Sequence, residues 1–167
     1  MGGEIKYAVF TTSMGWVGVS GSDKGLLCIA LPQRSAQQAR HLLGEGLNCA
    51  VRSGDCFGVL ISRLQTYFDG GKATFPDELD LSRATPFQRR VWEATRLIPY
   101  GETRSYAWVA QQVDEPGAAR AAGQALARNP LPIIIPCHRV IASDGKLGGF
   151  SDGVEMKRRL LRLEASA

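Results

Sequence analysis

Residues 132–140, "PIIIPCHRV", place three consecutive isoleucines before a proline, which a cysteine and a histidine follow. A run of β-branched apolar residues predicts a strand that is buried on both faces, and Pro136 ends it because proline cannot donate to a sheet ladder. We therefore expect Cys137 at the point where a rigid, buried element stops. A nucleophile gains most from a support that cannot move, so Cys137 is the first candidate for a reactive group.

The composition is that of a globular protein, with 167 residues of which 44% are hydrophobic and 22% charged. No apolar stretch is long enough to span a bilayer, and the N-terminus lacks the features of a secretory signal. We expect a cytoplasmic protein, or a nuclear one in a eukaryote, that does not bind membranes. Four cysteines without a CxxC pair and only two histidines predict reduced thiols and no metal site.

The positive charge belongs to the second half of the chain. Residues 1–82 carry 7 Lys and Arg against 8 Asp and Glu, whereas residues 83–167 carry 13 against 8. A basic excess in one domain favours a polyanionic partner, although many ordinary domains share this bias.

Short strand-like segments separated by turn residues characterise the first half. Residues 5–12, 15–20 and 25–31 predict a small antiparallel sheet. Apolar residues at helical spacing over 55–68 predict a helix that packs on this sheet. The polar segment 72–84 predicts a linker, which gives a structural domain over 1–82 and a second domain over 83–167.

The second half opens with "TPFQ", in which Thr85 and Gln88 form a capping box around a helix that begins at Pro86. Apolar spacing then predicts two short helices, over 106–113 and 119–126, with a tight turn between them, as in a helix-turn-helix. The predicted fold class is mixed α/β (α+β). It combines a small N-terminal antiparallel sheet and a helix with a mostly helical C-terminal domain, in which a short buried strand leads to the cysteine.

The outward face of the second short helix carries little bulk. It consists of Gly117, Ala121, Gln124 and Arg128, with Arg120 at its edge. Exposed helix faces usually carry Lys and Glu, so small residues indicate that something large approaches closely. The charge of this half favours nucleic acid; the alternative is an alanine-rich helix packed against another part of the protein.

The C-terminal segment places a carboxylate on an apolar stripe. Met156, Leu160 and Leu163 form the stripe, and helical geometry adds Glu164 to it. An inward-facing carboxylate needs a partner, and we predict that His138 is that partner and that it acts on Cys137 through a water. The alternative is a solvated last turn with Glu164 in water.

These motifs resemble the O6-alkylguanine-DNA alkyltransferases, also called methylated-DNA-protein-cysteine methyltransferases. The resemblance rests on "PCHRV" and on "TPFQRRVW", "IPYGETRSYAWVA", "GAARAAGQALARNPLPIIIPCHRVI" and "GGFSDG", in the family's order. It extends from Thr85 to Glu164, while the first half is similar only in general layout. Phe150 and Asp152 depart from the family pattern, which commonly has tyrosine and glycine at these two positions.

The resemblance implies a DNA repair enzyme that acts once, because it transfers the alkyl group irreversibly to its own Cys137. His138 and Glu164 would activate the thiol, Asn129 would be a hinge, and Tyr106 would favour base rotation and donate toward the guanine. The implied substrate-binding residues are Pro132, Val140, Phe150, Ser151 and Asp152. The implied DNA-binding residues are Tyr106, Ala118, Ala119, Arg120, Ala121, Gly123, Gln124 and Arg128, with Arg120 as the finger that fills the vacated base stack.

The implied partner is double-stranded DNA with O6-alkylguanine, bound through its minor groove, and no cofactor is needed. We expect a monomer and leave cooperative binding to DNA open. Three alternatives remain, namely a non-catalytic lesion-binding protein, a helix-turn-helix regulator and a thiol hydrolase. Cys137 argues against the first, the scarcity of base-reading side chains against the second, and the lack of an independent base against the third.

Overall fold

The computed structural model describes residues 4–44, 51–52, 55–148 and 153–165. The chain divides into two compact units, residues 1–82 and 83–167. Each unit has buried apolar residues of its own, such as Val17 and Leu64 in the first unit and Val91 and Leu131 in the second. Among the described residues, no helix is both long enough and apolar enough to cross a membrane.

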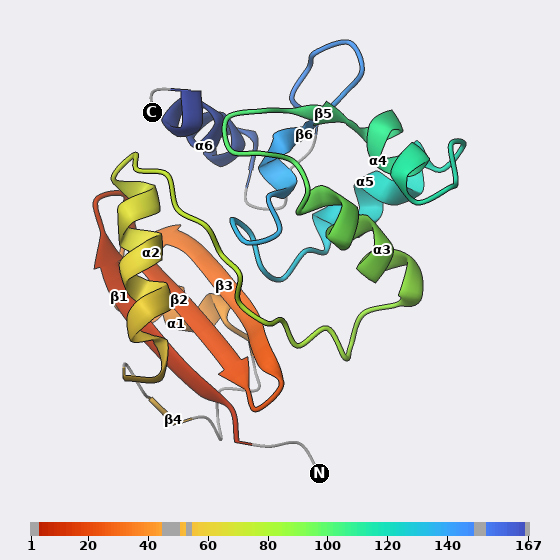
Figure 1. The fold of residues 1–167 in the computed structure, drawn as a ribbon. Coiled ribbons are helices and arrows are strands. Elements are labelled where there is room, and N and C mark those ends of the chain that lie inside the picture. Colours follow the sequence, from red (N-terminus) through yellow and green to blue (C-terminus); the bar gives the residue numbers. More distant parts are fainter. Residues whose placement is uncertain (1–3, 45–50, 53–54, 149–152, 166–167) are drawn as a thin grey trace. The chain divides into compact units, whose positions relative to one another are not determined.

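The first unit is built on the predicted antiparallel sheet. Strands β1 (Lys6–Thr12), β2 (Gly15–Ser22) and β3 (Gly25–Gln33) pair antiparallel, and β4 (Val51–Arg52) adds to β1 in parallel, in the order β3-β2-β1-β4 (Figure 1). This confirms the sheet that the sequence predicted.

Two helices and a short 3-10 helix complete the first unit. They are α1 (Ala36–Leu42), η2 (Asp55–Phe57) and α2 (Gly58–Phe68). Helix α2 confirms the helix predicted over 55–68 and buries Leu60, Leu64 and Phe68. Helix α1, which Ser35 caps, was not predicted.

The segment predicted as a linker is partly tied to the first unit. Leu79 forms an isolated bridge with Leu26, whose amide donates to the Glu78 carbonyl at 2.9 Å, and the Asp80 amide donates to the Leu26 carbonyl at 2.8 Å. The first unit therefore extends through this segment to Ser82.

The second unit is mostly helical. Its elements are α3 (Pro86–Thr95), β5 (Arg104–Ser105), α4 (Tyr106–Gln112), α5 (Ala119–Ala127), η3 (Cys137–Arg139), β6 (Val140–Ile141) and α6 (Val154–Ala165). Helix α3 has the predicted capping box, since the Gln88 amide donates to Thr85 Oγ1 at 3.1 Å and the Thr85 amide to Gln88 Oε1 at 3.0 Å. Strands β5 and β6 pair in parallel.

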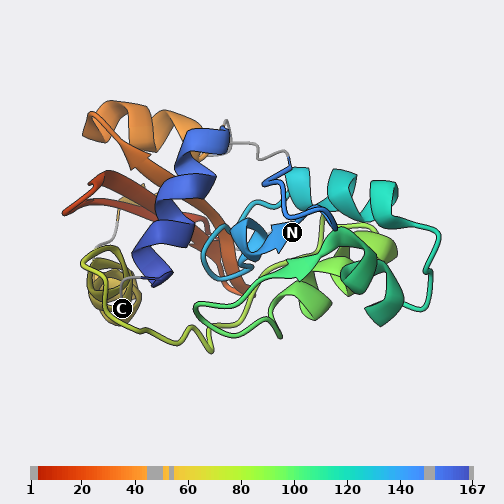
Figure 2. The same ribbon diagram turned by 90° about the horizontal axis from the view of Figure 1, so that it is seen from above.

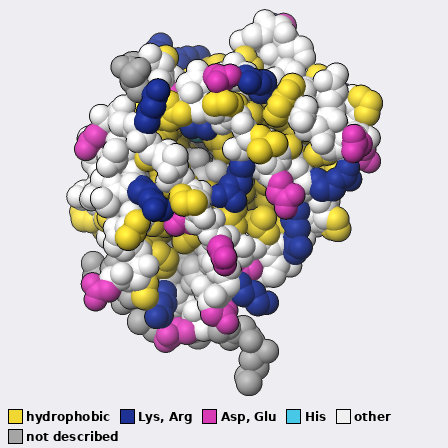
Figure 3. All heavy atoms as spheres, in the orientation of Figure 1, with side chains coloured by type: hydrophobic (Ala, Val, Ile, Leu, Met, Phe, Trp, Pro, Cys, Tyr) yellow, Lys and Arg dark blue, Asp and Glu magenta, His cyan; other side chains and the backbone are white. Residues whose placement is uncertain are grey.

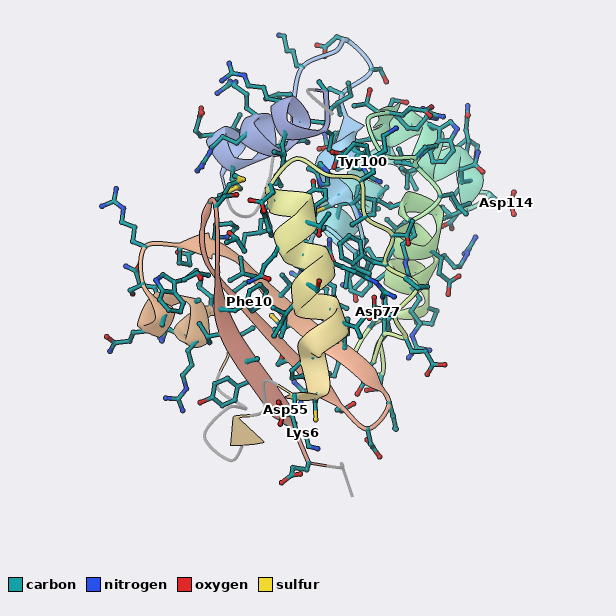
Figure 4. All side chains as sticks on the ribbon, turned by 60° about the vertical axis from the view of Figure 1, so that its left-hand side comes forward. Lys6, Phe10, Asp55, Asp77, Tyr100 and Asp114 are labelled. Carbon is teal, nitrogen blue, oxygen red and sulfur yellow. The ribbon has the colours of Figure 1, made fainter. Side chains whose placement is uncertain are left out.

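Helices α4 and α5 form the predicted pair of short helices. They pack through buried small residues, which include Ala110 and Ala122, and the turn between them contains Asp114 with φ 60°. The exposed Asp114 side chain points away from the unit (Figure 4). Helix α3 is fastened to α5 because Trp92 Nε1 donates to the Ala125 carbonyl at 2.9 Å.

The prediction of a short strand before Cys137 is wrong. Residues 132–134 form a turn, in which Ile133 has φ 76° and the Ile135 amide donates to the Leu131 carbonyl at 2.9 Å. A positive φ at a β-branched residue is incompatible with a strand, and the prolines at 132 and 136 remove two ladder donors. The predicted burial is correct, because Ile133, Ile134 and Ile135 are at most 4% exposed.

Candidate active site

Cys137 begins the short helix η3 directly after Pro136. Its side chain is 5% exposed, and its amide donates to the Ile135 carbonyl at 2.7 Å. The light-blue segment that carries Cys137 lies beside the green strand β5 in Figure 1 and Figure 2, because β6, which follows η3, pairs with β5. Backbone hydrogen bonds before and after Cys137 therefore support the segment that carries it.

Asn129 joins the end of α5 to the turn before Cys137. Its Nδ2 donates to the Ile135 carbonyl at 2.8 Å, and its Oδ1 accepts from the Leu131 amide at 2.8 Å. A single amide side chain therefore satisfies two backbone groups of the irregular segment. Asn129 therefore connects the end of α5 to the turn that precedes Cys137.

The carboxylate of Glu164 is buried and has several donors around it. His138 Nε2 lies 2.5 Å from Glu164 Oε2, and Arg139 donates to both oxygens, at 2.8 Å from Nε and 3.1 Å from Nη2. The Gly101 amide adds a bond of 3.1 Å to Oε1. The predicted contact between Glu164 and His138 is present, and the alternative of a solvated last turn does not hold, because Glu164 is 3% exposed.

Burial sets the protonation state of this cluster. It lowers the pKa of His138, an effect that the hydrogen bond and charge of Glu164 partly oppose. A neutral His138 that is bonded to a carboxylate through Nε2 carries its proton there, so Nδ1 is left with an acceptor lone pair. Burial also raises the pKa of Tyr100, and the charge of Glu164 adds to that rise.

A fully buried lysine, Lys157 on α6, was missed in the sequence. Its Nζ donates to the Val140 carbonyl at 2.6 Å and to the Leu147 carbonyl, and it lies 3.4 Å from the Tyr106 hydroxyl. Burial lowers the pKa of Lys157 from 10.5 to about 8, against the opposing effect of Cys137. A signal was available, because Lys157 shares the helical stripe of Leu160 and Glu164 at spacings of three and seven residues.

A cavity of about 700 Å³ opens beside Cys137. Residues from the helix-turn-helix, from η3 and from the segment after β6 line it: Tyr106, Ala107, Ala119, Arg120, Gly123, Gln124, Leu126, Ala127, Cys137, Ala142 and Ser143. Burial raises the pKa of Tyr106, and the charge of Cys137 adds to that rise, so Tyr106 keeps its proton as a donor. The structure thus brings Cys137, Tyr106 and Arg120 to one cavity.

The predicted DNA-facing residues on α5 and at its two ends differ in exposure. Arg120, Ala121, Gln124 and Arg128 are exposed, whereas Ala118, Ala119 and Gly123 are half-buried. On the face that Figure 3 draws, Lys and Arg side chains are interspersed with Asp and Glu side chains.

Several predicted substrate contacts stand apart from the cavity. Pro132 and Val140 are buried, and neither is among the described residues that line it. Phe150, Ser151 and Asp152 lie outside the described residues. Within the described part of the chain, no group of three or more His, Cys, Asp or Glu side chains could hold a metal ion.

Comparison with known proteins gives consistent matches. A family model described as "6-O-methylguanine DNA methyltransferase, DNA binding domain" matches residues 86–166. A methylated-DNA-protein-cysteine methyltransferase of Mycobacterium tuberculosis is 54% identical over 110 residues, which are 66% of either chain. The corresponding protein of Mycolicibacterium paratuberculosis is 40% identical over 160 residues, which are 96% of this chain and 92% of that one.

Solved structures agree over nearly the whole length. The crystal structure of Mycobacterium tuberculosis OGT in complex with DNA has a TM-score of 0.81 and 41% identity, and covers 96% of this chain and 93% of that chain. The O6-methylguanine-DNA methyltransferase from Pyrococcus kodakaraensis has a TM-score of 0.71 and 29% identity, with 96% and 98% covered.

A helix-turn-helix beside a buried cysteine and a Glu-His pair defines the DNA-binding half of an alkyltransferase. The chain belongs to the methylated-DNA-protein-cysteine methyltransferase family. The identification made from the sequence motifs, as a methyltransferase of DNA repair, is thereby confirmed.

Proposed function

We propose that the chain removes an alkyl group from O6 of guanine in duplex DNA and transfers it to Sγ of Cys137, once per molecule. The observation that carries this proposal is the cavity in which Cys137 meets Tyr106 and Arg120. A base cannot be attacked while it is stacked, so the damaged nucleotide has to leave the helix and enter such a cavity.

The proposed chemistry is a displacement at the alkyl carbon. The Cys137 thiolate attacks that carbon, an S–C bond forms, and the bond between the carbon and O6 of guanine breaks. The thiol proton leaves through a water to His138, whose acceptor nitrogen and bond to Glu164 at 2.5 Å suit it to this role. The thioether product is too stable to be reversed by water, which limits each protein to one turnover.

Protein groups that donate hydrogen bonds to the departing guanine would stabilise the negative charge that develops on it. Tyr106 is supported in this role because it lines the cavity and keeps its proton. We assign Ser151 as the donor to O6, Phe150 as a wall, and the backbone carbonyls of Cys137 and Val140 as acceptors for the guanine amino group; Pro132, which the sequence also predicted as a wall, is not among the residues that line the cavity. The Val140 carbonyl also accepts from Lys157, and a carbonyl has a second lone pair for this purpose.

We propose that α5 enters the minor groove and that Arg120 fills the space of the extruded base. The exposure of Arg120 and the small side chains around it support this arrangement, since a bare helix face permits close approach. Asn129 would then transmit the position of α5 to the cysteine turn. The protein would act inside the cell, as a monomer on its damaged DNA.

Transfer of label tests the function directly. Duplex DNA with radiolabelled O6-methylguanine is incubated with the protein, with Cys137→Ala and with Cys56→Ala, whose cysteine is exposed in the first unit. Label should move to the protein and to Cys56→Ala in a one-to-one ratio, but not to Cys137→Ala, which should still bind DNA. Stoichiometric labelling of Cys137→Ala would refute the assignment.

A further inference from the structure

Lys157 links three segments of the second unit. The lysine stands on α6, its acceptors Val140 and Leu147 lie on either side of the hairpin-like segment 141–146, and Tyr106 begins α4. Lys157 is 0% exposed, and its Nζ also lies 5.6 Å from the centre of the Tyr106 ring. A lysine that reaches this far into a core must have its donors satisfied, because a buried ammonium is otherwise very costly.

The chemistry of the two side chains fixes the direction of their contact. An ammonium has three protons and no lone pair, so it can only donate. The Tyr106 oxygen, 3.4 Å from Nζ, therefore accepts from Lys157 and holds its own proton on another side. Tyr106 lines the cavity beside Cys137, so the cavity is the side on which that proton is useful.

We propose that Lys157 is a positioning residue that directs the hydroxyl proton of Tyr106 into the cavity, toward the base. This role rests on the proposed function, since it requires an extruded base as the acceptor. Lys157 need not touch the base, because it acts by occupying the oxygen of the residue that does. The same ammonium also binds the carbonyls on either side of the hairpin-like segment, which lines the cavity. Lys157 therefore contacts both this wall of the cavity and the donor Tyr106.

Loss of the ammonium would let the phenol turn away. Without Lys157, the Val140 and Leu147 carbonyls lack the protons that they accept from it, and Tyr106 can donate to one of them instead of to the base. A neutral amine has the same effect, because it can accept from the phenol. The titratable groups that face Lys157 are Tyr106 on α4 and Cys137 and His138 on η3.

A double-mutant cycle on single-turnover rates tests the role. Tyr106→Phe should slow transfer in duplex DNA by about 100-fold, the lower end of the usual loss for one donor. Lys157→Met should slow it by a similar factor in the parent protein, but by less than about twofold when Tyr106 is already Phe, because independent changes would multiply. Equal factors in both backgrounds, or no loss from Lys157→Met alone, would overturn the proposal.

Two further variants separate positioning from general destabilisation. Leu160→Ala removes a buried apolar side chain one turn along α6, and its effect on the rate should multiply with that of Tyr106→Phe. Lys157→Gln keeps amide protons for the carbonyls but offers an oxygen to the phenol, so it should slow transfer even if Lys157→Met does not fold. A Lys157→Gln protein with the parent rate would also overturn the proposal.

The pH profile supplies a readout that a purely structural role would not move. With Lys157 neutral above its pKa of about 8, the transfer rate of the parent protein should fall, and this fall should be absent in Tyr106→Phe. A fall of the same size in Tyr106→Phe would overturn the proposal. If the parent protein transferred no label at all, the proposed function would be refuted. If the parent protein were active but the effects of Lys157→Met and Tyr106→Phe multiplied, only the positioning role of Lys157 would be refuted.

Discussion

The two units of the chain bury different kinds of side chain. Among the described residues of the first unit, Ser20 is the one buried polar side chain, and the rest of its core is apolar. Besides Cys137, the second unit buries Thr95 and four basic or acidic side chains, which are His138, Arg139, Lys157 and Glu164. The first unit has the interior of an ordinary folded domain, whereas the second keeps charged groups where they are costly.

This difference in buried side chains indicates that the second unit contains the reactive groups. Helix α6 supplies one buried carboxylate and one buried ammonium, two turns apart, to residues that follow Cys137 in the chain. Glu164 binds η3 through His138 and Arg139, and Lys157 binds β6 through Val140. The C-terminal helix is therefore part of the proposed active site, although none of its described residues is a nucleophile.

Among the substitutions that test this difference between the units, Glu164→Gln has the largest expected effect. Removal of the charge leaves Arg139 buried without its anion, so we expect the second unit to lose about 3 kcal/mol of unfolding free energy. Transfer should also slow, because His138 loses the carboxylate that favours its protonation. Denaturant unfolding and single-turnover rates measure the two effects.

Glu78→Gln is the matched control in the first unit, because Glu78 is exposed. It should change stability by less than about 0.5 kcal/mol and leave the rate unaltered. If Glu164→Gln behaved in the same way, the buried cluster would have no special role.

Stability against pH probes the other buried charge. Lys157 has a pKa of about 8 in the folded state and 10.5 in the unfolded chain, so between these values the unfolded chain binds more protons. Stability from this residue should rise as the pH increases from 8 to 10, and the full shift corresponds to about 3 kcal/mol. Tyr106, whose raised pKa has the opposite effect, limits the useful range to below its own titration.

The difference between the parent protein and Lys157→Met isolates this contribution. Urea unfolding at several pH values should show the rise in the parent alone. An equal rise in both proteins would assign it to other groups.

The sequence predicted the parts of this site that follow from local pattern. The capping box at Thr85, the sheet of the first unit and the inward position of Glu164 depend on spacing within one element. Lys157 was missed because a lysine is by default an exposed residue, and only the carbonyls of Val140 and Leu147, from other segments, explain its burial. The conformation at Ile133 was predicted wrongly for a related reason, since the Asn129 bonds that shape the turn before Cys137 are not visible in a run of isoleucines.

Arg120→Ala extends the comparison to exposed arginines. We expect repair of duplex DNA to fall by about tenfold, because Arg120 is proposed to stabilise an extruded state that costs a few kcal/mol. Reaction with free O6-methylguanine needs no extrusion and should change little. Single-turnover rates on both substrates decide, and equal losses would refute the role.

Arg63→Ala is the counterpart in the first unit. Arg63 lies 3.5 Å from Asp77 in a partly exposed ion pair, which contributes little to stability. Its loss should leave both rates unchanged. A loss on duplex DNA like that of Arg120→Ala would assign the DNA contact to the first unit as well.

The smallest expected effect concerns two glycines on either side of Leu147, whose carbonyl accepts from Lys157. Gly148 and Gly145 have φ of 72° and 86°, so alanine at either position should cost about 1 kcal/mol of stability through backbone strain. A Cβ at Gly148 would also lie 2.6 Å from the Tyr106 hydroxyl oxygen, whereas a Cβ at Gly145 meets nothing within 4 Å. Gly148→Ala should therefore displace Tyr106 and slow transfer several-fold, and Gly145→Ala should lower the melting temperature by a similar amount without slowing it. Equal rates in the two variants, at equal stability, would show that the position of the Tyr106 hydroxyl does not limit the reaction.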